Sequence, residues 1–61
     1  SMWFYDLQTG WWWTNEQYYP YVYLESAKDW VFYQPQADSK NRFFYLFADG
    51  GNWVTYPKSG Q

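Results

Sequence analysis

The chain has 61 residues, enough for one small domain, and 31% of them are aromatic: six Trp, eight Tyr and five Phe. Six acidic residues outnumber four basic ones, and this net charge of −2 disfavours a nucleic-acid partner, because phosphate binding depends on clustered cations. Cys and His are absent, which excludes a disulfide scaffold, a thiolate metal site and the commonest general base. We expect one domain over residues 1–61 with no metal and no cofactor. No run approaches the ~18 apolar residues of a spanning helix, so we expect no membrane insertion.

The first of three similar segments spans residues 3–14. An aromatic run ends at Tyr5, a polar stretch follows, and Trp11 opens a second aromatic run. Thr9 and Gly10 lie between the two runs, and Gly supplies the positive φ that tight turns require. Two strand-like runs around such a turn predict a β-hairpin.

The second segment spans residues 21–33 and has Tyr23 and Trp30 at the corresponding positions. Its turn region, Glu25–Asp29, contains no Gly. We therefore expect a looser loop or a short helical turn between its two strands.

The third segment spans residues 43–56, with Tyr45 and Trp53 at the recurring positions and two Gly in the turn over residues 49–52. Flanks rich in Trp, Tyr, Phe and Val around a polar centre are typical of strands joined by a turn. The sequence thus predicts an all-β fold of about six short antiparallel strands. The strands form three consecutive hairpins in one strongly twisted sheet or partial barrel.

Alternation along the strands places side chains on two faces, and both faces are apolar. In the second segment one face holds Tyr21, Tyr23, Trp30 and Phe32, and the other holds Val22, Leu24, Val31 and Tyr33. The pattern leaves open which face is buried. Rings that recur at equivalent positions are most simply explained as core. These recurring rings are Tyr5, Tyr23, Tyr45, Trp11, Trp30 and Trp53.

Rings that break the repeat are the candidates for ligand binding. Trp12 stands where the other segments carry Val, and Trp13 where they carry Phe or Thr. Three consecutive Trp alternate between the faces of a strand, so at least one is expected to be exposed. Tyr33 and Tyr56 end the second strands of their segments and are expected to border the same surface as Trp12. The predicted ligand-binding set is Trp12, Trp13, Tyr33 and Tyr56, with packing as the alternative for each ring.

The polar side chains favour structural roles over catalysis. Four of them lie in or near turns, where Asx side chains bond the local backbone. The sequence contains no D-x-D-x-D loop, the pattern that would favour calcium binding instead. These four are Asp6, Asp29, Asp49 and Asn52. Arg42 is expected to pair with an acid or to stack on a ring. The serines lack a His partner, and so small a sheet lacks a deep cleft for paired carboxylates, so we expect no enzyme.

Five aromatic motifs occur together over nearly the whole chain. They are Trp11-Trp12-Trp13-Thr14, Tyr19-Pro20-Tyr21-Val22-Tyr23, Trp30-Val31-Phe32-Tyr33, Arg42-Phe43-Phe44-Tyr45 and Gly51-Asn52-Trp53. In combination they resemble an aromatic-rich module at the ends of large secreted bacterial surface proteins. The resemblance implies an extracellular domain appended to a larger parent protein, and no particular activity.

A second similarity covers less of the chain. The run from Trp3 to Trp11, and Phe43-Phe44-Tyr45 followed by Asp49-Gly50, resemble the W-Y-Y-x-x-x-x-G hairpins of choline-binding cell-wall repeats. Those repeats stack into a solenoid and bind choline between Trp and Tyr rings. The spacing and turn chemistry differ here, and the second segment lacks the Gly.

Exposed Trp and Tyr rings on a small β scaffold suit the flat C–H faces of sugar rings, and aromatic side chains lose little entropy when immobilised. The leading hypothesis is a non-catalytic carbohydrate-binding module of a secreted bacterial protein, with a polysaccharide or other glycan as partner. An alternative is a structural or adhesive module that packs on a neighbouring domain or a cell-surface protein. A further alternative is an aromatic cage for choline or another quaternary ammonium.

Overall fold

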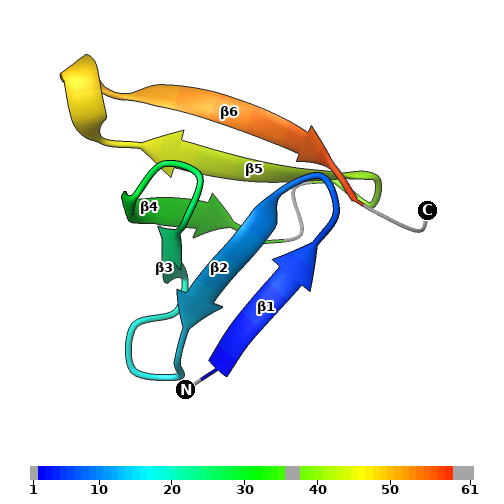
Figure 1. The fold of residues 1–61 in the computed structure, drawn as a ribbon. Coiled ribbons are helices and arrows are strands. Elements are labelled where there is room, and N and C mark those ends of the chain that lie inside the picture. The colour runs from blue at the N-terminus through cyan, green and yellow to red at the C-terminus, as the bar shows by residue number, and fades with distance from the viewer. Residues whose placement is uncertain (1, 36–37, 59–61) are drawn as a thin grey trace.

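A computed structural model describes residues 2–35 and 38–58 of the chain. Its strands are β1 (Met2–Asp6), β2 (Gly10–Thr14), β3 (Tyr21–Leu24), β4 (Asp29–Gln34), β5 (Asn41–Leu46) and β6 (Asn52–Pro57), and a short 3-10 turn, η1 (Ala48–Gly50), precedes β6. Each strand pairs antiparallel with its sequence neighbours in the order β1-β2-β3-β4-β5-β6 (Figure 1). The prediction of an all-β chain built from three consecutive hairpins is confirmed.

The sheet is open and strongly twisted. In the described residues, β1 pairs only with β2 and β6 pairs only with β5, so both are edge strands. Figure 1 shows the β1–β2 hairpin running at a steep angle to the β5–β6 hairpin. This twist lets one sheet wrap its own core without a second layer.

The first hairpin is closed by the side chain of Asp6. Its Oδ2 accepts hydrogen bonds from the backbone N–H of Gln8 (3.2 Å) and of Thr9 (3.1 Å), and Gly10 follows at φ +86°. The expected use of Asp6 in turn chemistry is confirmed, because an Asx side chain replaces backbone acceptors inside the turn.

The second hairpin turns without Gly through two successive backbone bonds. Ala27 N donates to Leu24 O and Lys28 N donates to Glu25 O, both at 3.1 Å. Lys28 takes the positive φ of +52° that Gly supplies elsewhere. Residues 25–28 thus form a hydrogen-bonded turn closed by two overlapping backbone bonds, with no helix assigned in it.

The third hairpin turns through η1 and depends on Gly51 for space as well as for its φ of +87°. A Cβ at this position would lie 2.6 Å from Tyr45 Cζ and would also meet the Tyr45 hydroxyl. Gly50 has a similar φ of +84°, but a Cβ there would meet nothing within 4 Å. The two glycines thus have a similar positive φ and differ in the space that a Cβ would find.

We expect Gly51→Ala to lower the free energy of unfolding by about 2 kcal/mol, against about 1 kcal/mol for Gly50→Ala. Both variants acquire a strained left-handed alanine, and only the first also displaces the ring of Tyr45. Urea denaturation followed by Trp fluorescence measures both values. Equal losses would show that the contact between Tyr45 and Gly51 contributes nothing.

The core is small and mostly aliphatic. Val22, Leu24 and Phe44 are 0% exposed and Val31 is 1% exposed. The face that carries Val22, Leu24 and Val31 is therefore the buried one, which settles the choice that the sequence left open. We call it the inner face and its opposite the outer face.

The prediction that the recurring rings form the core is wrong. Tyr5, Trp11, Trp30 and Trp53 are exposed, and Tyr23 and Tyr45 are half-buried. The physical reason is the curl of the sheet. Side chains converge on the side that encloses the core, where Val22, Leu24 and Val31 take fully buried positions, and the recurring rings project from the diverging side.

Candidate functional site

Three of the four predicted binding rings lie on the inner face. Trp12, Tyr33 and Tyr56 are half-buried and pack against the core. The ring centroids of Trp12 and Tyr33 are 6.1 Å apart. Phe44 lies 5.3 Å from Tyr33 and 5.9 Å from Tyr56, so these rings form one continuous packed set.

The indole of Trp12 has close neighbours. Phe4 stacks on it at 4.5 Å with an interplanar angle of 22°, and the guanidinium of Arg42 lies over the ring at 5.8 Å. Arg42 also approaches Asp6, with 3.7 Å between Nη2 and Oδ1, so both structural uses expected of this arginine are present. Little of the Trp12 ring face is left for a ligand.

Trp13 lies on the outer face, as alternation from Trp12 requires. It is opposite Trp3 of β1 and Tyr23 of β3 in the sheet register. Its ring centroid is 5.8 Å from that of Trp30. The structure thus separates Trp13 from the other three predicted rings, and the ligand role of all four stays a prediction.

The outer face carries two groups of rings in contact. The first, here the outer cluster, consists of Trp3, Tyr5, Trp11, Trp13, Tyr18, Tyr23 and Trp30. The second, here the distal cluster, consists of Tyr21, Phe32, Tyr45, Phe47 and Trp53. Most of these rings come from the recurring positions and their cross-strand neighbours, so the internal repeat builds an outer surface.

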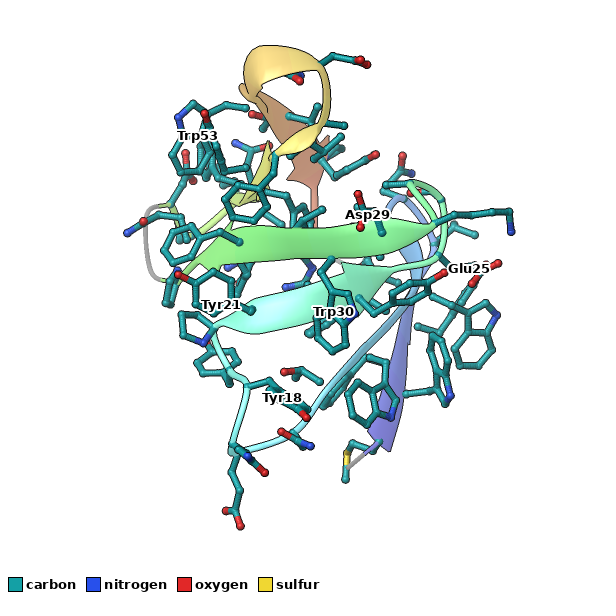
Figure 2. All side chains as sticks on the ribbon, turned by 90° about the vertical axis from the view of Figure 1, so that its left-hand side faces the viewer. Tyr18, Tyr21, Glu25, Asp29, Trp30 and Trp53 are labelled. Carbon is teal, nitrogen blue, oxygen red and sulfur yellow. The ribbon has the colours of Figure 1, made fainter. Side chains whose placement is uncertain are left out.

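Three open hollows adjoin one another over the outer cluster, and together we call them the aromatic groove. The first is lined by Trp3, Trp11 and Glu25. The second is lined by Trp3, Trp13, Tyr23, Glu25 and Trp30. The third is lined by Tyr18, Tyr21 and Trp30. Figure 2 shows Tyr21 on β3 and Trp30 on β4, with Tyr18 in the loop before β3 and Glu25 in the turn after it.

The walls of the aromatic groove are accessible. Trp3 and Trp11 are each 51% exposed, and Trp30 is 39% exposed. Edge-to-face contacts hold the rings against one another, with interplanar angles of 88° for Trp3 and Trp11 and 84° for Trp13 and Trp30. The groove therefore presents large apolar surfaces in a fixed arrangement.

Glu25 supplies a carboxylate to two of the three hollows. Its backbone N–H donates to the carbonyl of Trp11 at 3.0 Å, which fixes the β3–β4 turn beside β2. Its Oε2 accepts from Lys28 Nζ at 2.7 Å, and this hydrogen bond raises the pKa of the lysine. Asp29 lies nearby and accepts from the backbone N–H of Trp30 at 2.8 Å, in the local role predicted for it.

Two other hollows lie outside the aromatic groove. One is lined by Met2, Phe4, Thr14, Asn15, Glu16 and Tyr19, and the other by Gln34, Phe43, Trp53 and Thr55. Neither places more than one exposed aromatic ring along its walls. They offer less stacking surface than the aromatic groove.

No family model, curated protein or solved structure matches this chain. Within residues 2–35 and 38–58, no three metal-ligating side chains are grouped. The same part of the chain has no helix of the length and apolarity that crossing a membrane requires.

Proposed function

We propose that this chain is a non-catalytic carbohydrate-binding module that binds an extended polysaccharide along the aromatic groove. The proposal is carried by one observation, the three adjoining hollows walled by exposed Trp and Tyr rings. The C–H face of a pyranose stacks on the π-face of such a ring, and successive sugar units occupy successive hollows. Glu25 and the backbone around it supply acceptors for hydroxyl groups.

The rigidity of the groove supports affinity. Each wall ring stands on a strand or on a hydrogen-bonded turn and touches at least one other ring, as Trp30 touches Trp13, Tyr18 and Tyr23. A binding surface held in its bound form loses little conformational entropy when the ligand arrives. Repeated weak stacking over several sugar units then sums to useful affinity.

The proposal includes location. The resemblance to terminal modules of large secreted bacterial surface proteins supports an extracellular site of action, where polysaccharides are the abundant extended polymers. In that setting the domain tethers a parent protein to a glycan surface.

We expect Trp30→Ala to weaken polysaccharide binding about tenfold, corresponding to ~1.4 kcal/mol, because Trp30 lines two of the three hollows. Trp53→Ala is the matched control, since Trp53 is 52% exposed and lies outside the aromatic groove. Trp12→Ala, in the same assay, tests the platform predicted from the sequence. Affinity electrophoresis against a panel of soluble polysaccharides measures binding, and thermal unfolding verifies the fold.

Equal weakening by Trp30→Ala and Trp53→Ala would contradict a groove-specific site. Loss of binding in a stably folded Trp12→Ala, with Trp30→Ala unaffected, would move the site to the inner face. If the unmodified protein bound none of the glycans in the panel, the proposal itself would be overturned.

A second candidate function, an adhesive or structural module, is favoured by the free edge of β1. Met2, Trp3 and Tyr5 are exposed on this strand, and an unpaired edge is a template for pairing with another chain. Sedimentation equilibrium at increasing protein concentration, without glycan, distinguishes the two functions. Self-association combined with no glycan response favours the adhesive module.

A further inference from the structure

We infer that the hollow lined by Trp3, Trp11 and Glu25 binds an organic ammonium group. For a polysaccharide ligand, this inference rests on the proposed function. The preferred polymer then carries protonated amino sugars. The same chemistry also suits a free quaternary ammonium such as choline. The two sources share one requirement, a cation beside ring faces and a carboxylate.

The two tryptophans form a corner. Their ring centroids are 6.4 Å apart and their planes are nearly perpendicular, at 88°. In this edge-to-face contact the edge of one indole meets the face of the other, and the exposed parts of their π-faces carry the negative part of the ring quadrupole. A cation within ~6 Å of a ring centroid is attracted to that face, and Trp is the strongest ring in this respect.

Neighbouring rings hold the corner in place. Tyr5 lies 5.0 Å from Trp11, and Tyr23 lies 6.3 Å from Trp3 in a second edge-to-face contact. Each tryptophan remains about half exposed, so a ligand reaches the corner from solvent. The two rings are thus held in place by their neighbours and remain accessible to a ligand.

Glu25 completes the site with a negative charge. The bond from its backbone N–H to Trp11 O ties the carboxylate-bearing residue to one wall of the corner. The carboxylate already attracts an ammonium, because Lys28 Nζ lies 2.7 Å from Oε2. The Lys28 side chain is 75% exposed and does not line the hollow, so it leaves the corner free and competes only for the carboxylate.

The charge balance of the aromatic groove selects against polyanions. Among the described residues that line its hollows, Glu25 bears the only carboxylate and none is Lys or Arg. A uronate or sulfate would meet this carboxylate and electron-rich ring faces, and the residues that line the hollows include no cation to pair with it. A single carboxylate is also too few ligands for Ca²⁺, which takes six to eight oxygens. An organic cation suits the two indole rings and the carboxylate that line this hollow.

The test compares ligands of matched length by calorimetric titration. The probes are a glucosamine hexamer, an N-acetylglucosamine hexamer, a glucose hexamer with the same linkage geometry, and choline. At a pH where the amines are protonated, we expect the glucosamine hexamer to bind about tenfold more tightly than its acetylated counterpart. Glu25→Gln is expected to abolish this preference, so that the glucosamine hexamer binds no more tightly than its acetylated counterpart.

Lys28→Gln is the matched control, because it removes the competing cation from the same turn. We expect it to strengthen ammonium binding about two- to threefold, the opposite direction from Glu25→Gln. If choline binding is weakened by Glu25→Gln and strengthened by Lys28→Gln, and the glucosamine hexamer is not preferred, the corner binds a free quaternary ammonium. Equal binding of the three hexamers, insensitive to Glu25→Gln and with no choline response, overturns the inference and leaves glycan binding intact. No response to any probe overturns both proposals.

Discussion

Replacing Phe44 with alanine is expected to remove much or all of the stability of the folded chain at 25 °C. Phe44 is fully buried and touches Tyr33 and Tyr56 from its place on β5. Truncating a buried Phe to Ala costs about 3–5 kcal/mol, through lost burial and the cavity left behind. The whole stability expected of a domain this short is about 3–9 kcal/mol. One substitution thus removes much or all of it.

The matched control is Phe47→Ala, the same truncation at a ring that is 51% exposed. Phe47 contacts Tyr45 and Tyr21 on the outer face, so we expect a loss of only about 1 kcal/mol. Urea denaturation followed by near-UV circular dichroism measures both. A loss for Phe47→Ala as large as that for Phe44→Ala would mean that the outer rings, and not the aliphatic face, hold the fold together.

The hairpins were predictable because their signals are local. Gly10 sits where the first turn needs positive φ, and Asp6 supplies the side-chain acceptor that closes it. The second turn shows the limit of such signals. Lys28 adopts positive φ without being Gly, and only the pair of backbone bonds from Ala27 and Lys28 reveals how that turn closes.

The buried face was not predictable, because alternation gives the two faces and does not rank them. Tyr23 and Val22 are neighbours with opposite fates, and each belongs to an apolar set. The choice depends on the direction in which the sheet curls, and that direction follows from contacts among all six strands. Recurrence was the available signal. It marks positions under a common constraint, and here that constraint produces the exposed rings of the outer face.

The surroundings of the predicted binding rings could not be predicted, for the same reason. Trp12 was singled out because it breaks the repeat, and the structure places it under Phe4 and Arg42 on the inner face. Its ring packs against the core, and Leu24 is its partner in the β2–β3 register. Trp3 and Glu25 meet only because β2 lies between β1 and the turn after β3. A sequence pattern cannot supply that neighbourhood.

The largest expected effect of a polar substitution is that of Asp6→Ala. Asp6 is 6% exposed, and its two oxygens serve separate elements: Oδ2 closes the first turn, and Oδ1 faces Arg42 of β5 at 3.7 Å. Removing the carboxylate leaves the turn N–H groups of Gln8 and Thr9 without this acceptor. It also leaves the largely covered guanidinium of Arg42 without its counter-ion. We expect a loss of about 3 kcal/mol in the free energy of unfolding, measured by urea denaturation.

Two further variants separate the turn from the ion pair. Asp6→Asn keeps one oxygen acceptor for Gln8 and Thr9 and replaces the other oxygen by an uncharged amide nitrogen, so we expect about half the effect of Asp6→Ala. Arg42→Met keeps a long side chain over Trp12 and removes the cation. The double variant completes a thermodynamic cycle, in which we expect a coupling of about 1–2 kcal/mol. Additive losses, with no coupling, would show that Asp6 acts through the turn alone and that the link between the first hairpin and β5 depends on ring packing.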